Sequence, residues 1–436
     1  MSTFSEPFLN KNMNEDQKKI FDLLMKGYNL FVTGSAGTGK SFLINEFCKA
    51  NKDKRILITA PTGVAAQNVK GCTLHRAFKI PTNILMPSEP NKKNQKVIDM
   101  LDKTDILIID EISMCREDVF NYVLGYVHFV NKYRSKMNIK PIQVVLVGDF
   151  YQLPPVITKK EKETWKNIWK NSDGFAFQAA LWKTFDFHTV KLEKVIRQED
   201  EEFINALNKI RKGDHSGAEF LNNNFSNTVI DDAIFLCSRN DLADSINLDK
   251  LSEINNQEYV YNIRKNGKIT EIKKSDLVVD EELHLKIGAR VMVLINSNEG
   301  LYQNGSLGYV TDLDDDTVSV ELDNGNIVDF ERYKWDIYDY NIVYENNIPV
   351  DVKREAIASY EQIPLKLAYA VTIHKSQGQT YDAVNIDVNG IFANGQLYVA
   401  LSRCRSVNKI CVNAPITPNK VKTSYDVMFF YNEDLI

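Results

Sequence analysis

The stretch from Gly34 to Ser41 carries the residue types that hold phosphate groups. It reads GSAGTGKS, fits the pattern G-x-x-x-x-G-K-[ST], and follows the short apolar run Leu30-Phe31-Val32. Glycines let successive backbone N–H groups point at phosphate oxygens, the lysine reaches the β- and γ-phosphates, and the last hydroxyl holds Mg²⁺. A glycine-rich turn before a helix is the alternative, but the Lys-Ser pair in register favours a nucleoside triphosphate site. The predicted binding residues are Gly34, Ser35, Ala36, Gly37, Thr38, Gly39, Lys40 and Ser41.

Two further strand ends offer groups for hydrolysis. Asp110 and Glu111 follow four apolar residues; Asp110 would complete the Mg²⁺ shell with Ser41, and Glu111 could orient or deprotonate the attacking water. An acidic pair at a strand end is common in isolation, and the upstream phosphate loop favours the catalytic interpretation. Gln152, in the segment from Gly148 to Pro155, could sense the γ-phosphate through its amide, although an ordinary strand-end turn has the same pattern.

Arg197 and Arg403 are candidates for stabilising the transferred phosphoryl group, although both are distant in sequence from the phosphate loop. A correctly placed arginine accelerates phosphoryl transfer by roughly 10³–10⁵. The alternative for Arg197 is a surface pair with Glu193 or Glu199, worth about 0–1 kcal/mol. The local pattern does not choose between the two interpretations.

Two segments mix hydroxyls, histidine and small residues in a way that suits a single nucleic-acid strand. They run from Thr372 to Thr380 and from Thr73 to Phe78. Hydroxyls and backbone N–H groups bind phosphates, and His or Phe can lie under a base. The competing interpretation of His75 or His374, each taken alone, is a histidine of the core or of a turn whose hydrogen bonds are satisfied within the protein.

The elements that would position these groups alternate as in a βαβ sheet. Strands are expected at 29–33, 55–59, 106–109 and 143–147, and their polar carboxyl ends should meet in one crevice. A second αβ region begins near Thr189 and resumes after Pro364. Between them, short β-branched runs separated by Asn-Gly and Asp-rich turns indicate a meander or small barrel. We therefore expect lobe one at 1–188 with a surface excursion at about 79–96, lobe two at 189–250 and 364–436, and a β-rich insertion at 251–363.

Composition excludes several classes of protein. The chain has 436 residues, 44% apolar and 25% charged, as is ordinary for a globular protein with large cores. Its six cysteines form no C-x-x-C pair, which argues against zinc and disulfides and for a reducing, cytoplasmic location. We see no signal peptide in residues 1–10 and no apolar run near the ~18 residues of a membrane span. The net charge of −5 leaves nucleic-acid binding open, because affinity depends on where Lys and Arg lie.

Taken in order, the motifs resemble those of superfamily-one helicases of the petite-integration-frequency (PIF) type, with RecD-like enzymes as relatives. An ordered set of this kind is far more specific than any single motif. One departure is Asn138-Ile139-Lys140-Pro141, which stands where family members often carry Phe-Gly-Gly. Besides the phosphate loop, the set comprises Leu9-Asn10 with Gln17, Ala60–Ala66, Thr73-Leu74-His75, Asp110–Met114, Gly148–Val156, Leu192–Gln198, Gln362–Ala370, His374–Thr380 and Tyr398–Arg403.

The resemblance implies an α/β fold of two RecA-like P-loop lobes, with an Src-homology-three-like barrel inserted in the second lobe and a short wedge in the first. It implies ATP and Mg²⁺ as cofactors, Gln17 on adenine, and Arg197, Arg403 and Gly378 around the γ-phosphate. Single-stranded DNA would cross the tops of both lobes. Its contacts would be Thr62, His75, Thr372, His374 and Ser376, and the residue types of the two segments described above add Phe78 and Lys375.

The activity that the resemblance implies is ATP-driven movement 5′ to 3′ on single-stranded DNA, with unwinding of duplexes and, in many members, of G-quadruplexes. Replication, repair, recombination and telomere maintenance are the processes implied. We expect a monomer that binds single strands and their junctions with duplex and has no membrane partner. Two alternatives stay open: a motor of the same fold that acts on RNA or moves without unwinding, and a nucleotide-dependent binding switch with negligible catalysis.

Overall fold

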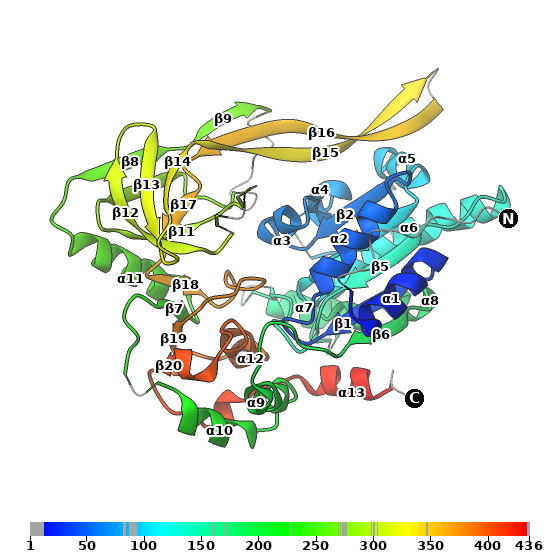
Figure 1. Ribbon diagram of the computed structural model, residues 1–436. Coiled ribbons are helices and arrows are strands. Elements are labelled where there is room, and N and C mark those ends of the chain that lie inside the picture. The colour runs from blue at the N-terminus through cyan, green and yellow to red at the C-terminus, as the bar shows by residue number, and fades with distance from the viewer. Residues whose placement is uncertain are drawn as a thin grey trace.

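The computed structural model describes residues 13–81, 84–86, 94–158, 161–170, 172–226, 228–268, 270, 272, 277–297, 299, 301–302, 304–345 and 348–433; at 64, 67, 338–345 and 348–354 only the backbone is described. Two α/β lobes, each built on a parallel sheet, lie side by side, and a region of antiparallel strands adjoins the second lobe (Figure 1). We call these parts lobe one, lobe two and the β domain. The predicted fold class is confirmed.

Lobe one is built on a six-stranded parallel sheet in the order β3-β2-β4-β5-β1-β6. The predicted strands form because each is a short, fully apolar run that both faces of a parallel sheet bury. Alternate residues point to opposite faces, so Leu30 and Val32 pack under α1 and α2, whereas Phe31 packs under α6. The strands are β1 Leu30–Gly34, β2 Ile56–Ala60, β3 Cys72–Thr73, β4 Ile106–Ile109, β5 Gln143–Val147 and β6 His188–Leu192.

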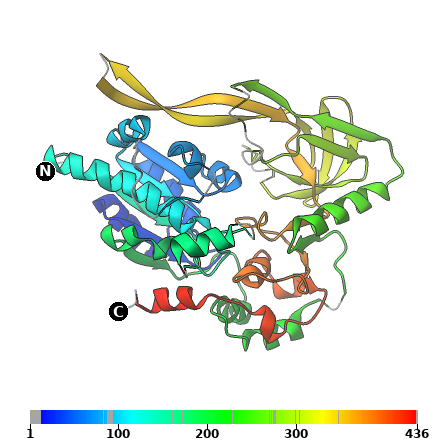
Figure 2. The same cartoon turned by 180° about the vertical axis from the view of Figure 1, so that it is seen from behind.

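Helices cover both faces of this sheet, as the view from behind shows (Figure 2). The helix α1 begins with a capping box in which Asn14 and Gln17 each bind the other's backbone N–H, and it ends at Gly27 in the left-handed conformation. The helices of this part are α1 Glu15–Lys26, α2 Lys40–Ala50, α3 Gly63–Asn68, α4 Leu74–Ala77, α5 Gln95–Asp102, α6 Glu117–Lys136, α7 Lys162–Trp169 and α8 Ala180–Thr184.

Lobe two has a four-stranded parallel sheet in the order β18-β7-β19-β20. Its strands are β7 Ile234–Cys237, β18 Ala370–Thr372, β19 Val384–Ile386 and β20 Ile410–Val412. Its helices are α9 Glu201–Arg211, α10 Gly217–Asn224, α11 Asn240–Ser252 and α12 Gln396–Leu401. The chain leaves this lobe between α11 and β18, where the β domain is inserted.

The β domain contains a five-stranded antiparallel sheet in the order β14-β13-β12-β11-β17, with a β10-β8 pair beside it. The predicted turns join these strands; at Asp323-Asn324-Gly325, for example, Gly325 adopts a φ of 83° that suits glycine. Its strands are β8 Glu258–Asn262, β9 Arg264–Gly267, β10 Glu282–Lys286, β11 Arg290–Val293, β12 Leu307–Leu313, β13 Thr317–Leu322, β14 Ile327–Glu331, β15 Tyr333–Glu345, β16 Ile348–Gln362 and β17 Leu365–Leu367.

A long ribbon, formed by β15 and β16, leaves the β domain and reaches over lobe one (Figure 1). Its strands lie against α4, α5 and β3. The sequence pattern predicts only short strands in this region, so the ribbon was not expected. The β domain is therefore anchored in lobe two but also touches lobe one.

The expected boundaries shift at three places. Strand β6 pairs along its full length with β1, so the chain stays in lobe one up to Leu192 instead of 188. Strand β17 pairs with β11, which extends the β domain to Leu367. The last helix, α13 Tyr425–Glu433, leaves lobe two and buries Val427 and Phe430 in the core of lobe one.

The excursion expected on the surface at 79–96 packs more closely than predicted. Ile80 and Leu85 are buried in the core of lobe one, and the Leu85 N–H donates to Asp118 Oδ2 over 3.0 Å. Residues 82–83 and 87–93 of the predicted wedge lie outside the described residues. None of the helices in the described ranges is long and apolar enough to cross a membrane.

Candidate active site between the two lobes

The phosphate loop connects β1 to α2 and needs glycine at two positions. Gly37 and Gly39 have φ values of 79° and 85°. A Cβ at Gly37 would lie 2.5 Å from the Arg197 Cβ, and one at Gly39 would lie 2.6 Å from the Gln17 Nε2. Because α2 begins at Lys40 with no side-chain cap, its first N–H groups and its positive dipole end are available to an anion.

The Lys40 amine points back into this loop. Its Nζ donates to the carbonyl oxygens of Gly34 and Ser35 over 2.8 and 3.1 Å. Burial lowers the pKa of Lys40, while the carboxylates of Asp149 and Glu111 act in the opposite direction. A phosphate oxygen would give this ammonium a charged partner in place of two neutral carbonyls, so the loop is suited to a triphosphate.

Asp110 and Glu111 lie at the carboxyl end of β4, and with Ser41 they line one groove. Burial and the neighbouring Glu111 carboxylate raise the pKa of Asp110. Glu111 adopts left-handed backbone angles, φ 49° and ψ 47°, a costly conformation for a non-glycine residue that persists only where the surrounding structure holds it. A hydroxyl and a carboxylate with uncompensated negative charge fit Mg²⁺, which takes few protein ligands and completes its shell with water and phosphate.

A side-chain amide of lobe two meets this acidic pair. The Gln377 Nε2 donates to Glu111 Oε2 over 2.9 Å and to Gln152 Oε1 over 3.4 Å. The Gln377 Oε1 is buried and has no hydrogen-bond partner among the described residues. Three side chains from three separate segments, two in lobe one and one in lobe two, therefore converge at one point beside the groove.

Arg197 and Arg403 lie close together beside the phosphate loop. Arg197 Nη1 donates to the Ser402 carbonyl over 2.9 Å, and burial together with Arg403 lowers the pKa of Arg197 to about 9. Arg403 is 2% exposed and donates to the Val399, Ser376 and Gln379 carbonyls. Within the described residues neither guanidinium has a carboxylate within 4.0 Å, so the pair lacks an anionic partner that phosphates would supply.

Gln17 is held beneath the phosphate loop. Its side chain is 1% exposed, its Oε1 accepts from the Asn14 N–H, and its Nε2 donates to the Thr38 carbonyl over 3.4 Å. A contact between Gln17 and adenine stays a prediction. Gly378 is exposed in the groove and faces Asn68 of lobe one.

The groove has a volume of about 1380 Å³ and runs from Asp110 and Glu111 towards the β domain. Of the predicted strand-binding residues, Thr372 and Lys375 line it, together with Lys366, which the sequence analysis missed. Burial and Lys375 lower the pKa of Lys366 to about 8. Further along, Val279, Asp280 and Trp335 of the β domain complete the wall.

Other predicted strand contacts lie elsewhere. Thr62 follows β2 and its Oγ1 accepts from the Ala65 N–H over 3.3 Å, and His75 lies on α4 of lobe one. His374 is half-buried, and burial lowers its pKa. These three stay predictions, because none of them lines the groove described above.

Two predicted strand contacts are wrong in this structure. Phe78 has no exposed surface and belongs to the core of lobe one, because α4 turns its C-terminal end inward. Ser376 also has no exposed surface, and its Oγ donates to the Ile373 carbonyl over 2.8 Å. Neither side chain can reach a nucleic acid.

Sequence reasoning also missed groups inside motifs that it had identified. Gln377 lies in the segment 374–380, and Tyr398 opens the segment 398–403. The Tyr398 hydroxyl accepts a hydrogen bond of 2.8 Å from the Ala36 N–H, so lobe two contacts the phosphate loop directly. Lys366 lies in the segment 362–370, where its basic side chain was the only available signal.

Comparisons with known proteins agree with this geometry. Residues 12–219 match the family model described as PIF1-like helicase. The proteins named ATP-dependent DNA helicase Pif1 from Campylobacter jejuni and Bdellovibrio bacteriovorus are 33% and 34% identical, over 88% and 97% of this chain and 88% and 92% of their own lengths.

Solved structures give the same result. Bacteroides sp Pif1 in complex with ADP-AlF4 is 36% identical, with a TM-score of 0.82 and coverage of 96% of both chains. Bacteroides Pif1 bound to ssDNA, at the same 36% identity, has a TM-score of 0.67 and covers 98% of this chain and 97% of that one. These similarities over nearly the whole length show that the chain belongs to the PIF1-like helicase family.

Proposed function

We propose that this chain, an ATP-dependent DNA helicase, moves 5′ to 3′ along single-stranded DNA and separates duplex DNA by hydrolysing ATP between its two lobes. The observation that carries the proposal is the contact of Gln377 with Glu111 and Gln152. It makes the hydrolytic centre a shared property of both lobes, so that hydrolysis can be coupled to their relative movement.

The site residues take the following proposed roles. The phosphate loop and Lys40 hold the triphosphate, and Glu111 accepts a proton from the attacking water, which Gln152 and Gln377 orient. Arg197 and Arg403 meet the γ-phosphate when the lobes close. Ser41 and Asp110 would hold Mg²⁺, which supplies positive charge to the phosphates when bound.

The strand is proposed to occupy the groove next to this site. Lys366 and Lys375 supply positive charge to its backbone, with Thr372 and Gly378 beside them. The direction of movement, the unfolding of G-quadruplexes and a monomeric state rest on the family resemblance. We also propose a reducing compartment, because the six cysteines are unpaired thiols and five of them are buried.

The decisive experiment compares fluorescent duplexes that carry either a 5′ or a 3′ single-stranded tail, with and without ATP. We expect ATP-dependent unwinding of the 5′-tailed duplex only, and a G-quadruplex behind a 5′ tail should also unfold. Equal unwinding from a 3′ tail contradicts the polarity. ATPase stimulated by single-stranded RNA as strongly as by DNA favours an RNA motor, and ATPase without strand separation favours a non-unwinding translocase.

Lys40→Ala tests the assignment of the phosphate loop. Removing the ammonium takes away the charged contact to the β- and γ-phosphates, so both ATPase and unwinding should fall to background. Lys49→Ala is the matched control, because this exposed lysine of the same helix pairs with Glu46 and lies outside the groove. Substantial turnover in Lys40→Ala would overturn the phosphate-loop assignment.

The arrangement of the parts is proposed to change when DNA binds. This chain superposes better on the Bacteroides Pif1 complex with ADP-AlF4 than on the complex with ssDNA, although the identity is the same. We expect X-ray scattering in solution to change more on addition of single-stranded DNA than on addition of ADP-AlF4, which closes lobes that already touch in this structure. A larger change with the nucleotide analogue than with DNA would contradict the proposal.

A further inference from the structure

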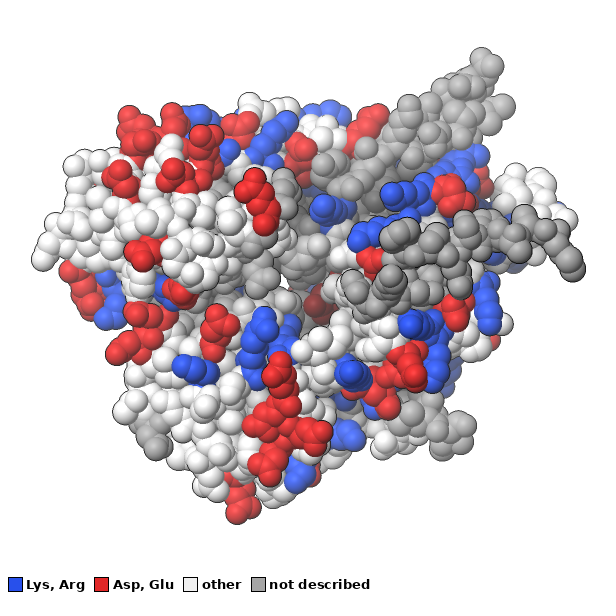
Figure 3. Space-filling model, viewed as in Figure 1, with Lys and Arg blue, Asp and Glu red and all other residues white. Residues whose placement is uncertain are grey.

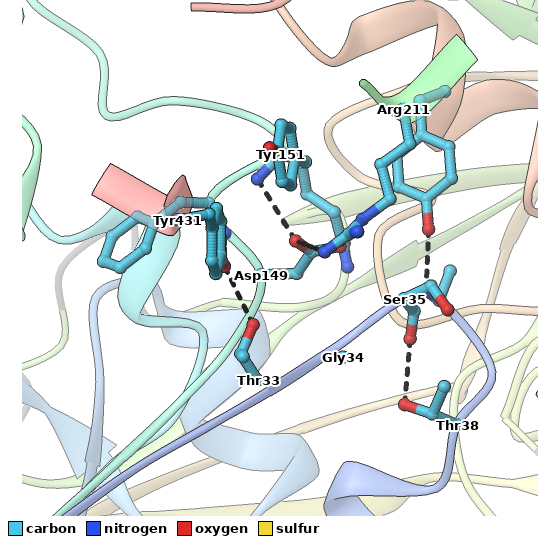
Figure 4. Close-up of polar contacts among 12 residues, drawn as sticks. Thr33, Gly34, Ser35, Thr38, Asp149, Tyr151, Arg211 and Tyr431 are labelled. Atoms are coloured by element: carbon cyan, nitrogen blue, oxygen red, sulfur yellow. Dashed lines mark hydrogen bonds and ion pairs between the residues drawn. The ribbon is translucent and has the colours of Figure 1, made fainter. Parts of the chain in front are cut away.

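A buried cluster behind the phosphate loop brings together three segments that are far apart in the sequence. It contains Asp149 after β5, Arg211 at the end of α9, and Tyr431 of α13, with Tyr151 between them (Figure 4). None of these side chains lines the groove in which nucleotide and strand are proposed to bind. The cluster nevertheless touches the segments on both sides of the catalytic centre.

Arg211 and Asp149 form an ion pair across the two lobes. The Arg211 Nε and Nη2 donate to Asp149 Oδ2 and Oδ1 over 3.0 and 2.7 Å, and the two residues are 6% and 0% exposed. Burial alone would lower the pKa of Arg211, but the Asp149 carboxylate more than offsets this and raises it. Separating the pair would leave two charges buried without partners, which is strongly unfavourable.

Tyr431 ties the same point to the start of the phosphate loop. Its hydroxyl accepts from the Phe150 N–H over 3.2 Å and lies 2.8 Å from the Oγ1 of Thr33, the residue before Gly34. Its ring stacks on Tyr151 with centroids 4.8 Å apart and planes at 8°. The Arg211 guanidinium lies over Tyr151 at 4.4 Å, so the cation is held by aromatic faces as well as by the carboxylate.

The segment held in this way leads directly to Gln152. The Tyr151 N–H donates to Asp149 Oδ1 over 3.2 Å, and Leu153 is fully buried in the core of lobe two. Gly395, at the start of α12, fits against the Tyr151 and Gln152 carbonyls, which would lie 2.5 and 2.3 Å from a Cβ there. The backbone around Gln152 is therefore fixed by both lobes at once.

We propose that Arg211 and Tyr431 are positioning residues for ATP hydrolysis, which hold the segment Asp149–Gln152 against both the phosphate loop and lobe two. Closure of the lobes then turns about this cluster and does not separate it. Arg211 and Tyr431 touch neither substrate nor the attacking water; they act through Gln152. This proposal rests on ATP hydrolysis at the phosphate loop, which Lys40→Ala tests separately.

The first test removes one hydroxyl. Tyr431→Phe keeps the stacked ring but loses the bonds to Thr33 and Phe150, and loss of such hydrogen bonds corresponds to about a 3- to 10-fold effect. We expect the kcat of the DNA-stimulated ATPase to fall by about this factor while the KM for ATP stays within about twofold. Tyr425→Phe is the matched control, because Tyr425 lies on the same helix and is 83% exposed.

The second test changes the ion pair. Arg211→Lys keeps the charge but loses the two-point contact, and Arg211→Met removes the charge; kcat should fall in the order wild type, Lys, Met, again with little change in KM. Arg239→Lys, in an exposed pair with Asp241, is the control and should leave kcat unchanged. Arg211→Met is the variant at risk of misfolding, so melting temperatures are measured for all variants. If Arg211→Met does not fold, the result for Tyr431→Phe decides the test.

A double-mutant cycle with Gln152 distinguishes an effect of Arg211 on the position of Gln152 from an effect on the stability of the whole fold. If Arg211 acts through Gln152, Arg211→Lys should reduce kcat strongly in the wild type and much less in a Gln152→Ala background. A purely structural role predicts the same factor in both backgrounds. Independent factors, or an unchanged kcat in both folded Tyr431→Phe and folded Arg211→Lys, would overturn the proposal.

Discussion

The Gln377 amide crosses from lobe two to the Glu111 carboxylate, and this contact bears on when Glu111 can act as a base. A donor beside a carboxylate fixes the orientation of its oxygens. Since the donor belongs to the other lobe, the contact exists only when the lobes are correctly placed. Hydrolysis between lobes that have parted should therefore be slow.

Gln377→Ala should lower the kcat of the DNA-stimulated ATPase by about 10- to 100-fold, with a smaller effect on the KM for ATP. The reason is the loss of a hydrogen bond to a charged group, worth about 1.5–3 kcal/mol. Steady-state ATPase assays at saturating single-stranded DNA measure both constants. Gln95→Ala, at an exposed position of α5, is the control; a Gln377→Ala enzyme with normal kcat would remove the amide from the mechanism.

Lys366 gives DNA binding a dependence on pH. Burial and Lys375 lower its pKa to about 8, while Asp280 acts in the opposite direction. A DNA phosphate favours the ammonium form, so binding above pH 8 takes up a proton, and affinity should fall by up to about tenfold between pH 7 and pH 9. Fluorescence anisotropy at constant ionic strength measures this. The fall should be smaller in Lys366→Met, and an identical slope in that variant contradicts the assignment.

Spacing predicted the reactive groups but not which side chains are accessible. The phosphate loop and Asp110-Glu111 could be identified because their chemistry needs fixed residue types at fixed spacing. The burial of Phe78 and Ser376 could not, since a short segment after a strand does not reveal which of its faces meets the core. Gln377 became recognisable as part of the site only when lobe two was placed beside Glu111.

At the scale of elements, the end of α5 depends on an arginine of α6. Arg134 is 2% exposed and its Nη2 donates to the carbonyls of Leu101 and Asp102, the last residues of α5. These carbonyls have no partner within the helix, so the side chain serves as its C-terminal cap. The ribbon of β15 and β16 crosses the same side of lobe one, over α5 (Figure 1).

Arg134→Met should destabilise the protein by about 1–3 kcal/mol, because it removes the charged donor from the carbonyls of Leu101 and Asp102. Urea unfolding followed by circular dichroism should show an earlier midpoint. Lys132→Met is the control on the same helix, since Lys132 is exposed. Equal midpoints for the two variants would show that the cap contributes nothing.

The predicted strands and helices of the two lobes were found because their patterns are local. Runs such as Ile106–Ile109 are apolar throughout, which only a doubly covered strand permits. The β15–β16 ribbon and the crossing of α13 into lobe one depend on contacts between distant segments, and local periodicity carries no information about them. For the same reason the boundary at Leu192 was displaced by one strand.

For the whole molecule, binding of DNA must overcome a net charge of −5. Figure 3 shows Asp and Glu interspersed with Lys and Arg over the visible face, so that this face carries no continuous patch of positive charge. If the strand lies in the groove, the positive charge that it meets there is local and comes from Lys366 and Lys375, which line the groove.

We expect the affinity for single-stranded DNA to fall with salt at a shallow slope of log K against log salt, about −1.5 to −3 for roughly two to four phosphate contacts. Anisotropy titrations at salt concentrations from about 50 to about 300 mM measure this slope, because exposed charges are increasingly screened over that range. The double variant of Lys366 and Lys375 to Met should lower the slope by about 1.4. An unchanged slope would place the strand outside this groove.

The docking of α13 also has a consequence for how the chain is made. The core of lobe one contains Val427 and Phe430, and Tyr431 reaches the residue before the phosphate loop. During synthesis the sheet of lobe one leaves the ribosome first, and these three side chains follow only after lobe two and the β domain. A nascent chain can thus form the sheet of lobe one early, but it completes the surroundings of its phosphate loop only after lobe two has emerged.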